Sequence, residues 1–378
     1  MADCIAIIGA GISGAWLAYR LAAAGQTVLV IDDERTGRAT GWNPGGINPL
    51  HGPGFPGVME DFYREAFEIH SAQYEHIQSA SGIDFGWRVV DRLFLASSAA
   101  EADQLREHQL HYKLFPGFSG EWLDQAELIG WDSRVAAGWT GGLLTRGNVR
   151  VDSERYRLAL LTAASAIGAQ LITGTLKCVG VNGDRITSID WGQGRTAVSA
   201  LCMATGSWSG DAIDGWSPGA TVPVSALIGD LLLVRSNATP PLADINHGLT
   251  AIYQHEGDCF WIGGTTRREG PLGKTTEEIE RRLIDGAQAL MPGWAISEVV
   301  GRSSAARPSS ADQLPIVGRT LNYQNGWIIN GLGGKGILLS AWAADCMVRM
   351  IRAGEELPEL ARVSPSRPIE DSWQKTIA

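Results

Sequence analysis

The sequence predicts an α/β protein, α+β overall, with two domains, and three observations carry this prediction. An apolar run at 5–8, a glycine-rich turn, a helix at about 12–24 and a second apolar run at 28–31 form the pattern of two parallel strands joined by a helix. A chain of 378 residues is long enough for two domains. Three later apolar runs are typical of strands in one antiparallel sheet: 229–236, 250–257 and 258–266.

The first turn carries the pattern G-x-G-x-x-G at Gly9, Gly11 and Gly14. Gly9 permits the tight turn, Gly11 lets a pyrophosphate approach the backbone, and Gly14 lets the helix pack on the strand. The helix N-terminus offers free N–H groups and the positive end of the helix dipole. Asp32 ends the second strand, where dinucleotide-binding folds place a carboxylate for the ribose hydroxyls. Because all these parts occur together, the sequence predicts dinucleotide binding rather than a structural glycine turn.

The remaining elements follow from apolar periodicity and from glycine and proline punctuation. Residues 37–57 are too rich in glycine and proline for a regular element, and so long a loop is often functional. The predicted helices cover 58–81, 99–109, 152–168, 275–291 and 338–354. The predicted strands cover 91–98, 169–172, 176–182, 185–191, 200–210 and 326–333, with glycine turns ending the last two.

Composition narrows the class of protein. The formal net charge of −10 argues against a nucleic-acid surface, so no nucleic-acid partner is expected. Five cysteines occur without a C-x-x-C pair, which predicts no metal site and favours reduced, buried thiols in a cytoplasmic protein. No signal peptide precedes the first strand, and no apolar run approaches the roughly 18 residues of a membrane span.

The arrangement of a strand followed by glycines appears three times. After "IIGAG" it returns as "MATGSWSG" at 203–210 and as "IINGLGGKG" at 328–336. Glycine lets another backbone or a ligand approach closely. A simple nicotinamide dehydrogenase needs only the first of these glycine turns. Three of them, far apart in the chain, predict a larger, elongated ligand.

These stretches also resemble a known family. The resemblance rests on "ATGSW" at 204–208, "RPSSADQLPIVGR" at 307–319, "GLGGKGILLS" at 331–340 and "GRATGWNPGGINPLHG" at 37–52. Together they resemble the flavin-dependent amine and amino-acid oxidases of the D-amino-acid oxidase, glycine oxidase and sarcosine oxidase group. The resemblance implies FAD rather than NAD as cofactor. It also implies a discontinuous Rossmann-like FAD-binding domain and a second domain on a mixed, largely antiparallel sheet.

In that arrangement the FAD-binding domain would comprise 1–85, 146–215 and 306–378, and the substrate domain 86–145 and 216–305. The resemblance places the pyrophosphate at the first glycines, the adenosine ribose at Asp32, the turn at 204–206 under FAD, and the N–H groups of 333–337 at the flavin pyrimidine. The implied cofactor residues are Gly9, Gly11, Ile12, Ser13, Gly14, Asp32, Asp33, Thr40, Cys178, Ala204, Thr205, Gly206, Gly333, Gly334, Lys335, Gly336 and Ile337.

Cys178 and Cys202 are expected to pack as small apolar residues near FAD. Some relatives bind flavin covalently through a cysteine beside the "RP" segment. Ala306 and Arg307 stand at that place here, so a noncovalent FAD is expected.

Arg307 is the first candidate for the catalytic site. In the family, the arginine of "RP" binds the substrate carboxylate, and a guanidinium suits a carboxylate through two parallel hydrogen bonds. The alternative is an arginine that joins two domains through a salt bridge. Lys335 could stabilise a reduced flavin or point into solvent.

His51 and Asn48 lie in the loop that the resemblance places near the flavin ring, although a loop histidine is often merely exposed. Relatives place a carboxylate-binding tyrosine in the strand before "GDCFWIGGTT". Aligned with those relatives without gaps, this sequence has Ala251 at the position of the tyrosine. Tyr253 lies two residues later and therefore on the same face of the strand as Ala251. Tyr253 is therefore a candidate, with a half-buried sheet tyrosine as the alternative.

The leading hypothesis is an FAD-dependent oxidoreductase that oxidises the C–N bond of an amino acid or N-alkyl amino acid. The substrate would pass a hydride to flavin N5, and water would hydrolyse the resulting imine. Two alternatives remain open: a tRNA wobble-uridine modification oxidoreductase, which "ADQLPIVGR" and "GLGGKG" also resemble, and a non-catalytic flavin-binding subunit. The expected partners are an amino acid or amine, oxygen or another electron acceptor and, as an open alternative, further copies of the chain in a homo-oligomer.

Overall fold

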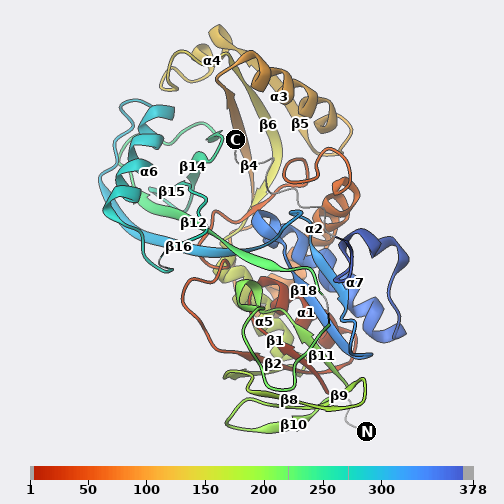
Figure 1. The fold of residues 1–378 in the computed structure, drawn as a ribbon. Helices are drawn as coiled ribbons and strands as arrows, with labels where there is room; N and C mark the ends of the chain where they lie inside the picture. Colours follow the sequence, from red (N-terminus) through yellow and green to blue (C-terminus); the bar gives the residue numbers. More distant parts are fainter. Residues whose placement is uncertain (1–3, 220, 271, 369–378) are drawn as a thin grey trace.

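A computed structural model describes residues 4–219, 221–270 and 272–368, and its strands form three sheets (Figure 1). The six-stranded sheet has the order β17-β18-β11-β1-β2-β7. Its central strands are parallel, and β17 runs antiparallel to β18. These strands are β1 (Cys4–Ile8), β2 (Thr27–Asp32), β7 (Gln170–Thr173), β11 (Ala200–Met203), β17 (Ile316–Arg319) and β18 (Gly326–Asn330).

The parallel sheet is covered on both faces. One face packs its alternate residues, among them Ile5, Ile7 and Val30, against helices. The other face packs Ala6 and Ile31 against a small antiparallel sheet of β8 (Cys178–Asn182), β9 (Arg185–Asp190) and β10 (Arg195–Ala197). This double burial explains why both first strands are continuously apolar in sequence. The helices are α1 (Ile12–Ala23), α2 (Glu60–Ser81), α5 (Ser153–Ala166) and α7 (Gly336–Ala353).

The third sheet forms the other half of the molecule, in the upper part of Figure 1. Its order is β16-β12-β15-β14-β13-β4-β6-β3, with β5 also paired to β6. The pair β13 and β4 is parallel, and the other pairs described are antiparallel. The strands are β3 (Gly46–Ile47), β4 (Arg88–Ala96), β5 (Ser119–Asp124), β6 (Gly141–Arg150), β12 (Val224–Arg235), β13 (Asp244–His247), β14 (Thr250–Gln254), β15 (Cys259–Gly263) and β16 (Glu298–Ser310).

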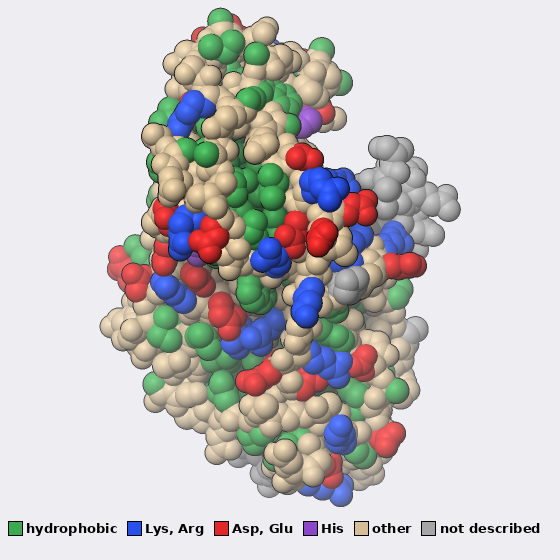
Figure 2. Space-filling view, turned by 90° about the vertical axis from the view of Figure 1, so that its left-hand side faces the viewer, with side chains coloured by type: hydrophobic (Ala, Val, Ile, Leu, Met, Phe, Trp, Pro, Cys, Tyr) green, Lys and Arg blue, Asp and Glu red, His purple; other side chains and the backbone are tan. Residues whose placement is uncertain are grey.

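Helices flank this sheet, and short 3₁₀ turns lie elsewhere in the fold. The sheet's helices are α3 (Ala99–Tyr112), α4 (Gln125–Trp131) and α6 (Glu277–Leu290). The 3₁₀ turns are η1 (Gly206–Trp208), η2 (Gly333–Lys335) and η3 (Pro358–Val363). No helix in the described part of the chain is long and apolar enough to cross a membrane. On the face shown in Figure 2, basic and acidic side chains are interspersed rather than separated.

The predicted fold class is confirmed, and each helix and strand that the sequence predicted is present. Most ends agree within a few residues, but β11 ends at Met203 rather than at 210, and β12 begins at Val224 rather than at 229. Eight elements were not predicted: β3, β5, α4, β6, β10, β13, β16 and β17. The strand β6 holds three glycines and β16 is rich in serine, so neither shows the apolar run that indicates a strand. The domain boundaries stay a prediction; the expected breaks at 145/146 and 305/306 fall within β6 and β16.

The expectation of buried thiols is wrong for Cys178 and is only partly met by Cys4 and Cys259, which are half-buried. Cys202 and Cys346 are buried, but Cys178 is exposed at the start of β8. Its strand packs only alternate residues, such as Val179, against the parallel sheet. A one-residue difference in strand register moves a side chain from the core to solvent.

Gly14 should be needed for folding itself. A Cβ at this position in α1 would lie 1.9 Å from the carbonyl oxygen of Gly9. We therefore expect Gly14→Ala to lower the free energy of unfolding by about 1–3 kcal/mol or more, despite the better helix propensity of alanine. Denaturant unfolding measures this. Gly130→Ala in α4, whose Cβ would meet nothing within 4 Å, is the matched control and should not destabilise the protein. Equal stability of the two variants would contradict the packing argument.

Candidate active site

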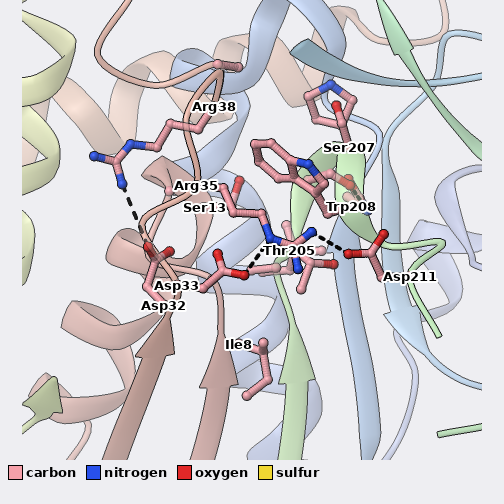
Figure 3. Close-up of a pocket in the computed structure, with 18 of the residues that line it drawn as sticks. Ile8, Ser13, Asp32, Asp33, Arg35, Arg38, Thr205, Ser207, Trp208 and Asp211 are labelled. Carbon is pink, nitrogen blue, oxygen red and sulfur yellow. Dashed lines mark hydrogen bonds and ion pairs between the residues drawn. The ribbon is translucent and has the colours of Figure 1, made fainter. Parts of the chain in front are cut away.

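A cavity of about 390 Å³ lies at the carboxyl ends of β1, β2 and β11 (Figure 3). It brings together all three glycine-rich turns that the sequence singled out, although the first and the last, at Gly9 and Gly336, are 327 residues apart along the chain. Of the predicted cofactor residues, the following line it: Gly9, Gly11, Ile12, Ser13, Asp32, Asp33, Thr40, Ala204, Thr205, Gly206, Gly333 and Gly336.

The glycines of the fingerprint have different reasons to be glycine. Gly9 has a φ of +99°, and a Cβ there would lie 2.4 Å from the carbonyl oxygen of Ala204. Gly14 does not line the cavity and serves the packing of α1 on the turn. A Cβ on Gly11, in contrast, would meet only the Thr40 Oγ1 at 3.7 Å, which is an ordinary contact. The protein's own packing therefore does not require glycine at position 11, and the open space there suits a ligand that approaches the backbone.

Asp32 is held in place by backbone donors. Its Oδ2 accepts a hydrogen bond from the N–H of Ala10 at 2.5 Å, and its Oδ1 accepts one from Glu34 at 2.8 Å. The Thr40 hydroxyl accepts from the N–H of Ile12 at 3.1 Å and so satisfies one free donor at the start of α1. The carboxylate thus has a fixed orientation at the cavity, as ribose binding requires.

Arg38 and Thr205 indicate whether the lining of this cavity fits a phosphate-bearing cofactor. The Nη1 of Arg38 is buried, has no hydrogen-bond partner within the described residues and lies 3.8 Å from the Asp32 carboxylate. The Nη2 of the same guanidinium donates to Glu154 at 3.5 Å. The hydroxyl of Thr205 is also buried without a partner among these residues. Both residues line the cavity. Buried polar groups normally find partners, so these groups fit an anionic ligand in the cavity.

Arg35 spans the cavity wall. Its guanidinium binds Asp33 at 2.5 Å and also forms an ion pair with Asp211, while it lies 5.7 Å from the centre of the Trp208 ring (Figure 3). These contacts tie the end of β2 to η1. Arg35 and Arg38 each have one partner nearby in the sequence, Asp33 and Asp32, but no spacing pattern indicates their second partners, Asp211 and Glu154, which are 176 and 116 residues away.

A second cavity, of about 670 Å³, opens beside the first. Both cavities are lined by Ile12, Ala39, Thr40, Gly333 and Gly336, so they meet where the N-termini of α1 and α7 face each other. An elongated ligand in the first cavity can therefore reach the second. The second cavity is lined by every predicted catalytic residue (His51, Tyr253, Arg307 and Lys335) and by Asn48, Gly334 and Ile337.

Arg307 lies on β16 and extends across the neighbouring strand β12. A Cβ on Gly229 would be 1.8 Å from its guanidinium, so glycine makes room for the side chain. Its Nη2 donates to the carbonyl of Thr265 at 2.9 Å. Burial lowers the pKa of Arg307, opposed by the nearby Tyr253 and Asp230. Arg307 forms no ion pair within the described residues, so a domain-joining salt bridge has no partner there.

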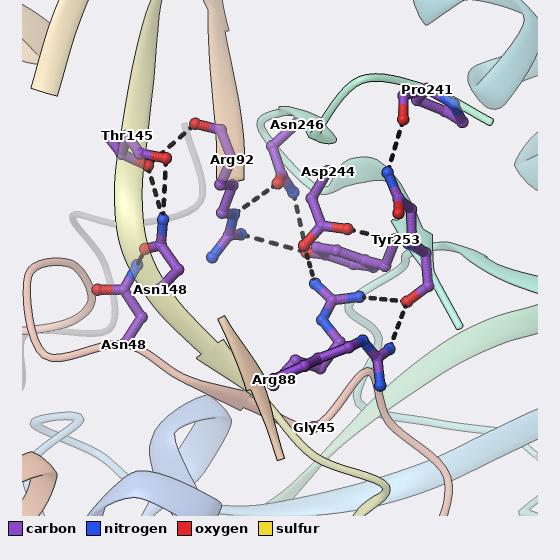
Figure 4. Close-up of polar contacts among 12 residues, drawn as sticks. Gly45, Asn48, Arg88, Arg92, Thr145, Asn148, Pro241, Asp244, Asn246 and Tyr253 are labelled. Carbon is purple, nitrogen blue, oxygen red and sulfur yellow. Dashed lines mark hydrogen bonds and ion pairs between the residues drawn. The ribbon is translucent and has the colours of Figure 1, made fainter. Parts of the chain in front are cut away.

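Tyr253 points its hydroxyl into a polar network (Figure 4). The oxygen accepts from the Nδ2 of Asn246 at 2.8 Å and from the Nη2 of Arg92 at 3.3 Å. With two donors on its oxygen, the phenol can direct its own proton toward a ligand. Ala251, the other position that alignment with the relatives suggested for the tyrosine, is buried and does not line the cavity. Of the two positions, only Tyr253 faces the cavity.

Lys335 and His51 are close together in a cationic part of the cavity. The Nζ of Lys335 donates to the backbone carbonyl of Asn48 at 3.0 Å. Burial, and then the charge of Arg92, hold the pKa of Lys335 well below its usual range. Burial, followed by Lys335, Arg92 and His108, also holds the pKa of His51 well below its usual range, so its ring is neutral at pH 7.

Asn48 contributes its backbone rather than its side chain. Its Nδ2 donates to Asn148 at 2.6 Å and its Oδ1 accepts from the N–H of Leu50 at 2.8 Å, so both ends of the amide are engaged (Figure 4). Cys178 is the one predicted cofactor residue on the wrong surface: it is exposed and lines neither cavity.

Several residues that organise the site were missed from the sequence. Arg92 lies on β4 and donates its Nε to Asn246 at 2.7 Å. Beneath Tyr253, Arg150 forms a fully buried ion pair with Asp244 and lies 4.6 Å from the Tyr253 ring centre. The signal for Arg92 was its position two residues before Phe94 in a predicted strand, which puts both on one face. Nothing in the sequence around Arg150 or Asp244 indicates that these two residues form an ion pair, because they are 94 residues apart along the chain.

His70 fixes the start of α7 from α2. Its Nε2 donates to the carbonyls of Leu338 at 2.9 Å and Ile337 at 3.0 Å, so its Nδ1 accepts from the Tyr156 hydroxyl at 2.7 Å. Burial lowers the pKa of His70 to about 4, so the ring is neutral. This contact holds the first turn of α7, whose N–H groups face the junction of the two cavities.

Two joined cavities, one framed by a dinucleotide fingerprint and one lined with cationic side chains, are the architecture of a dinucleotide-dependent enzyme. The family model described as "FAD dependent oxidoreductase" (DAO) matches residues 4–350. The chain therefore belongs to this family of FAD-dependent oxidoreductases, and the predictions of family and of FAD as cofactor are confirmed.

Individual relatives cover nearly the whole chain. Glycine oxidase from Pseudomonas aeruginosa is 23% identical over 97% of this chain and 99% of its own length. D-amino acid dehydrogenase from Rhizobium rhizogenes is 22% identical, with 96% and 99% covered. The crystal structure of glycine oxidase from Geobacillus kaustophilus superposes with a TM-score of 0.87 at 22% identity, over 98% of this chain and 100% of that one.

Gly11 should matter for FAD and not for the fold. In Gly11→Val the side chain would occupy the space beside the α1 N-terminus, while it meets only Thr40 in the protein itself. We expect a folded protein with little or no flavin, measured as flavin absorbance per protein beside the circular dichroism spectrum. A fully yellow Gly11→Val protein would place the pyrophosphate elsewhere.

Lys335 should make stability depend on pH. Its folded pKa is lower than its ordinary value of 10.5, so the unfolded chain binds more protons between these two pKa values. The free energy of unfolding should therefore rise with pH across this window in the wild type, relative to Lys335→Met. Urea unfolding between pH 7 and the ordinary lysine pKa measures the difference. Lys274→Met, at an exposed position, is the control and should show no such trend. Parallel pH curves for wild type and Lys335→Met would exclude a lowered pKa.

Proposed function

We propose that this FAD-dependent oxidoreductase oxidises the C–N bond of an amino acid or N-alkyl amino acid to an imine, which water then hydrolyses. The observation that carries the proposal is Arg307, a guanidinium that lines the second cavity without a carboxylate partner within the described residues. A substrate carboxylate supplies the missing charge. The names of the relatives, glycine oxidase and D-amino acid dehydrogenase, support an amino acid as substrate.

Arg307 and Tyr253 together would hold the substrate carboxylate. The guanidinium offers parallel N–H donors, and the Tyr253 phenol offers an O–H donor whose oxygen is already fixed by Asn246 and Arg92. Fixing the carboxylate at one end orients the α-carbon within the cavity. Such positioning can account for a large share of the rate when the reacting atoms are held in line.

FAD would be held by the Gly11 backbone, Asp32 and Arg38 in the first cavity, and by the N-terminus of α7 where the cavities meet. When bound, FAD supplies the acceptor for the hydride that leaves the α-carbon. We further propose that it is bound without a covalent link. No cysteine lines either cavity among the described residues, and Ala306 precedes Arg307.

The cationic cavity would also set the charge of the substrate amine. An amine must be neutral to release a hydride from its α-carbon, and nearby positive charges lower the pKa of an ammonium group. Arg92, Arg307 and Lys335 supply those charges. Burial, and then the charges of Lys335 and Arg92, keep the ring of His51 neutral and weakly basic. The positive potential of the cavity, rather than a strong base, therefore favours the neutral amine.

The test is anaerobic reduction of the bound flavin by a panel of amino acids and by the matching simple amines. Wild-type protein should lose its flavin absorbance with at least one amino acid and respond poorly to the amine without the carboxylate. Arg307→Ala should retain FAD and lose about 10- to 100-fold in kcat/KM for the amino acid, because a charge-assisted bidentate contact is lost. Arg307→Lys should recover only part, because an ammonium lacks the planar fork.

The amine is also the control for Arg307. If Arg307 acts on the carboxylate, Arg307→Ala should handle the amine no worse than wild type does. An equal loss on acid and amine would make Arg307 structural. A flavin that no amino acid or amine reduces would instead favour a non-catalytic flavin-binding subunit.

A further inference from the structure

The second cavity contains more positive charge than one carboxylate can neutralise. Of its lining arginines and lysine, Arg150 is neutralised by its buried ion pair with Asp244. Arg92, Arg307 and Lys335 form no ion pair with any described carboxylate. Two guanidinium cations therefore share one cavity with a buried lysine, and none of the three has an ion-pair partner among the described residues.

The acidic residues nearby are already engaged. Glu101 is the one carboxylate among the described residues that line the cavity, and it accepts from the N–H of Ser97 at 2.7 Å and contacts His247 at 3.2 Å. Asp230, whose charge reaches Arg307, does not line the cavity and is bound by Arg267 at 2.9 Å. Asp244 lies opposite Arg92 in the pairing of β13 with β4 and interacts with its charge, but its ion pair is with Arg150. None of these three carboxylates forms an ion pair with Arg92.

Arg92 is held rigidly, but only by neutral groups. Its Nε donates to the Asn246 amide oxygen at 2.7 Å and its Nη2 to the Tyr253 hydroxyl at 3.3 Å, and its guanidinium lies 4.6 Å from the Phe94 ring centre (Figure 4). Its Nη1 makes no hydrogen bond to a described residue. The guanidinium is thus oriented at the cavity with an N–H group left for a ligand. An unpaired charge in such a place costs stability, and an anionic ligand offsets that cost.

Arg92 and Arg307 both lie near Tyr253. The Tyr253 hydroxyl accepts from Arg92, and the same phenol is close enough to Arg307 to affect its charge state. Arg92 lies on β4 and Arg307 on β16, and four strands (β12, β15, β14 and β13) separate β4 from β16 in the order of the sheet. The two guanidinium groups are therefore separate anion-binding positions in one cavity.

We propose that the substrate is an amino acid with a second carboxylate, which Arg92 binds while Arg307 binds the α-carboxylate. This inference rests on the proposed function, because it assigns the α-carboxylate to Arg307. Arg92 thereby determines specificity: it favours a dianionic substrate over the corresponding monocarboxylic amino acid. Lys335 lines the same cavity, where burial and the charge of Arg92 disfavour its own charged form.

The test uses pairs of substrates that differ by one carboxylate. Iminodiacetate against N-methylglycine places the second carboxylate on the nitrogen substituent, and aspartate against alanine, in both enantiomers, places it on the side chain. With FAD-loaded wild type, we expect at least one diacid to exceed its partner about 10-fold or more in kcat/KM. Arg92→Gln should lower kcat/KM about 10- to 100-fold more for that diacid than for the monoacid, whose binding also depends on Arg92 through the Tyr253 hydroxyl. Arg92→Lys should restore part of the preference.

The matched control is Arg88→Gln. Arg88 lies on the same strand β4, carries the same charge and donates to the Gln254 carbonyl at 2.9 Å, but it does not line the cavity. It should keep the wild-type preference for the diacid. If Arg88→Gln and Arg92→Gln change the preference equally, the effect is general electrostatics and the assignment of Arg92 is wrong.

A binding measurement separates this inference from the proposed function. Succinate and propionate, which cannot be oxidised at a C–N bond, are titrated against the flavin absorbance spectrum of the FAD-loaded protein. Succinate should bind about 10-fold more tightly than propionate in wild type and lose that advantage in Arg92→Gln. If amino acids reduce the flavin but neither diacid nor succinate is preferred, this inference fails while the proposed function stands. If no amino acid reduces the flavin yet the preference for succinate depends on Arg92, the proposed function fails and the second anion position stands.

Discussion

The close approach of three backbone turns at the carboxyl edge of the parallel sheet is the constraint on which the rest of the structure depends. The turn after β1 touches the turn after β11 so closely that Gly9 has no room for a Cβ beside the Ala204 carbonyl. The N–H of Ala204 donates to Ile8 at 2.8 Å and continues the parallel pairing to the very end of the strands. Segments nearly 200 residues apart are thus fixed against each other by backbone atoms, and the cofactor cavity opens directly above them.

The same edge fixes the substrate cavity. Arg307 lies between two residues that are bound to the cofactor side: the N–H of Ala306 donates to Gly37 at 2.8 Å, and Ser309 pairs with Leu332 just before η2. The Ser207 hydroxyl also donates to the Ala306 carbonyl at 3.2 Å. The carboxylate-binding candidate is therefore not carried by an independent domain. Its backbone is attached to the loop after β2, to η1 and to the start of α7, so its position relative to a bound flavin is set by the FAD-binding fold itself.

How much the sequence could predict depended on the range of the interactions. The fingerprint at Gly9, Gly11 and Asp32 is local, because a strand, a turn and a helix impose their spacing on neighbouring residues, and this part agreed with the structure. The resemblance added Arg307 and Lys335, which line the second cavity as expected. Arg92 and Arg38 were missed because their partners lie on other strands and loops. Cys178 was misplaced because alternation in a short edge strand offers no way to tell which residues are covered.

The uneven distribution of charge between the two halves of the site follows from what each half must hold. In the cofactor cavity, two backbone N–H groups orient the Asp32 carboxylate, and two carboxylates neutralise the charge of Arg35. These groups therefore define the geometry of the cavity without leaving a large net charge. In the substrate cavity, Arg92, Arg307 and Lys335 are oriented by carbonyl, amide and hydroxyl oxygens, which fix their positions but leave their charges unneutralised. Neutral acceptors are what a binding site for anions requires, because a carboxylate partner would compete with the ligand. In the free protein, the unpaired charges in this cavity raise the free energy of the folded state. A ligand with matching negative charge offsets that free-energy cost when it binds.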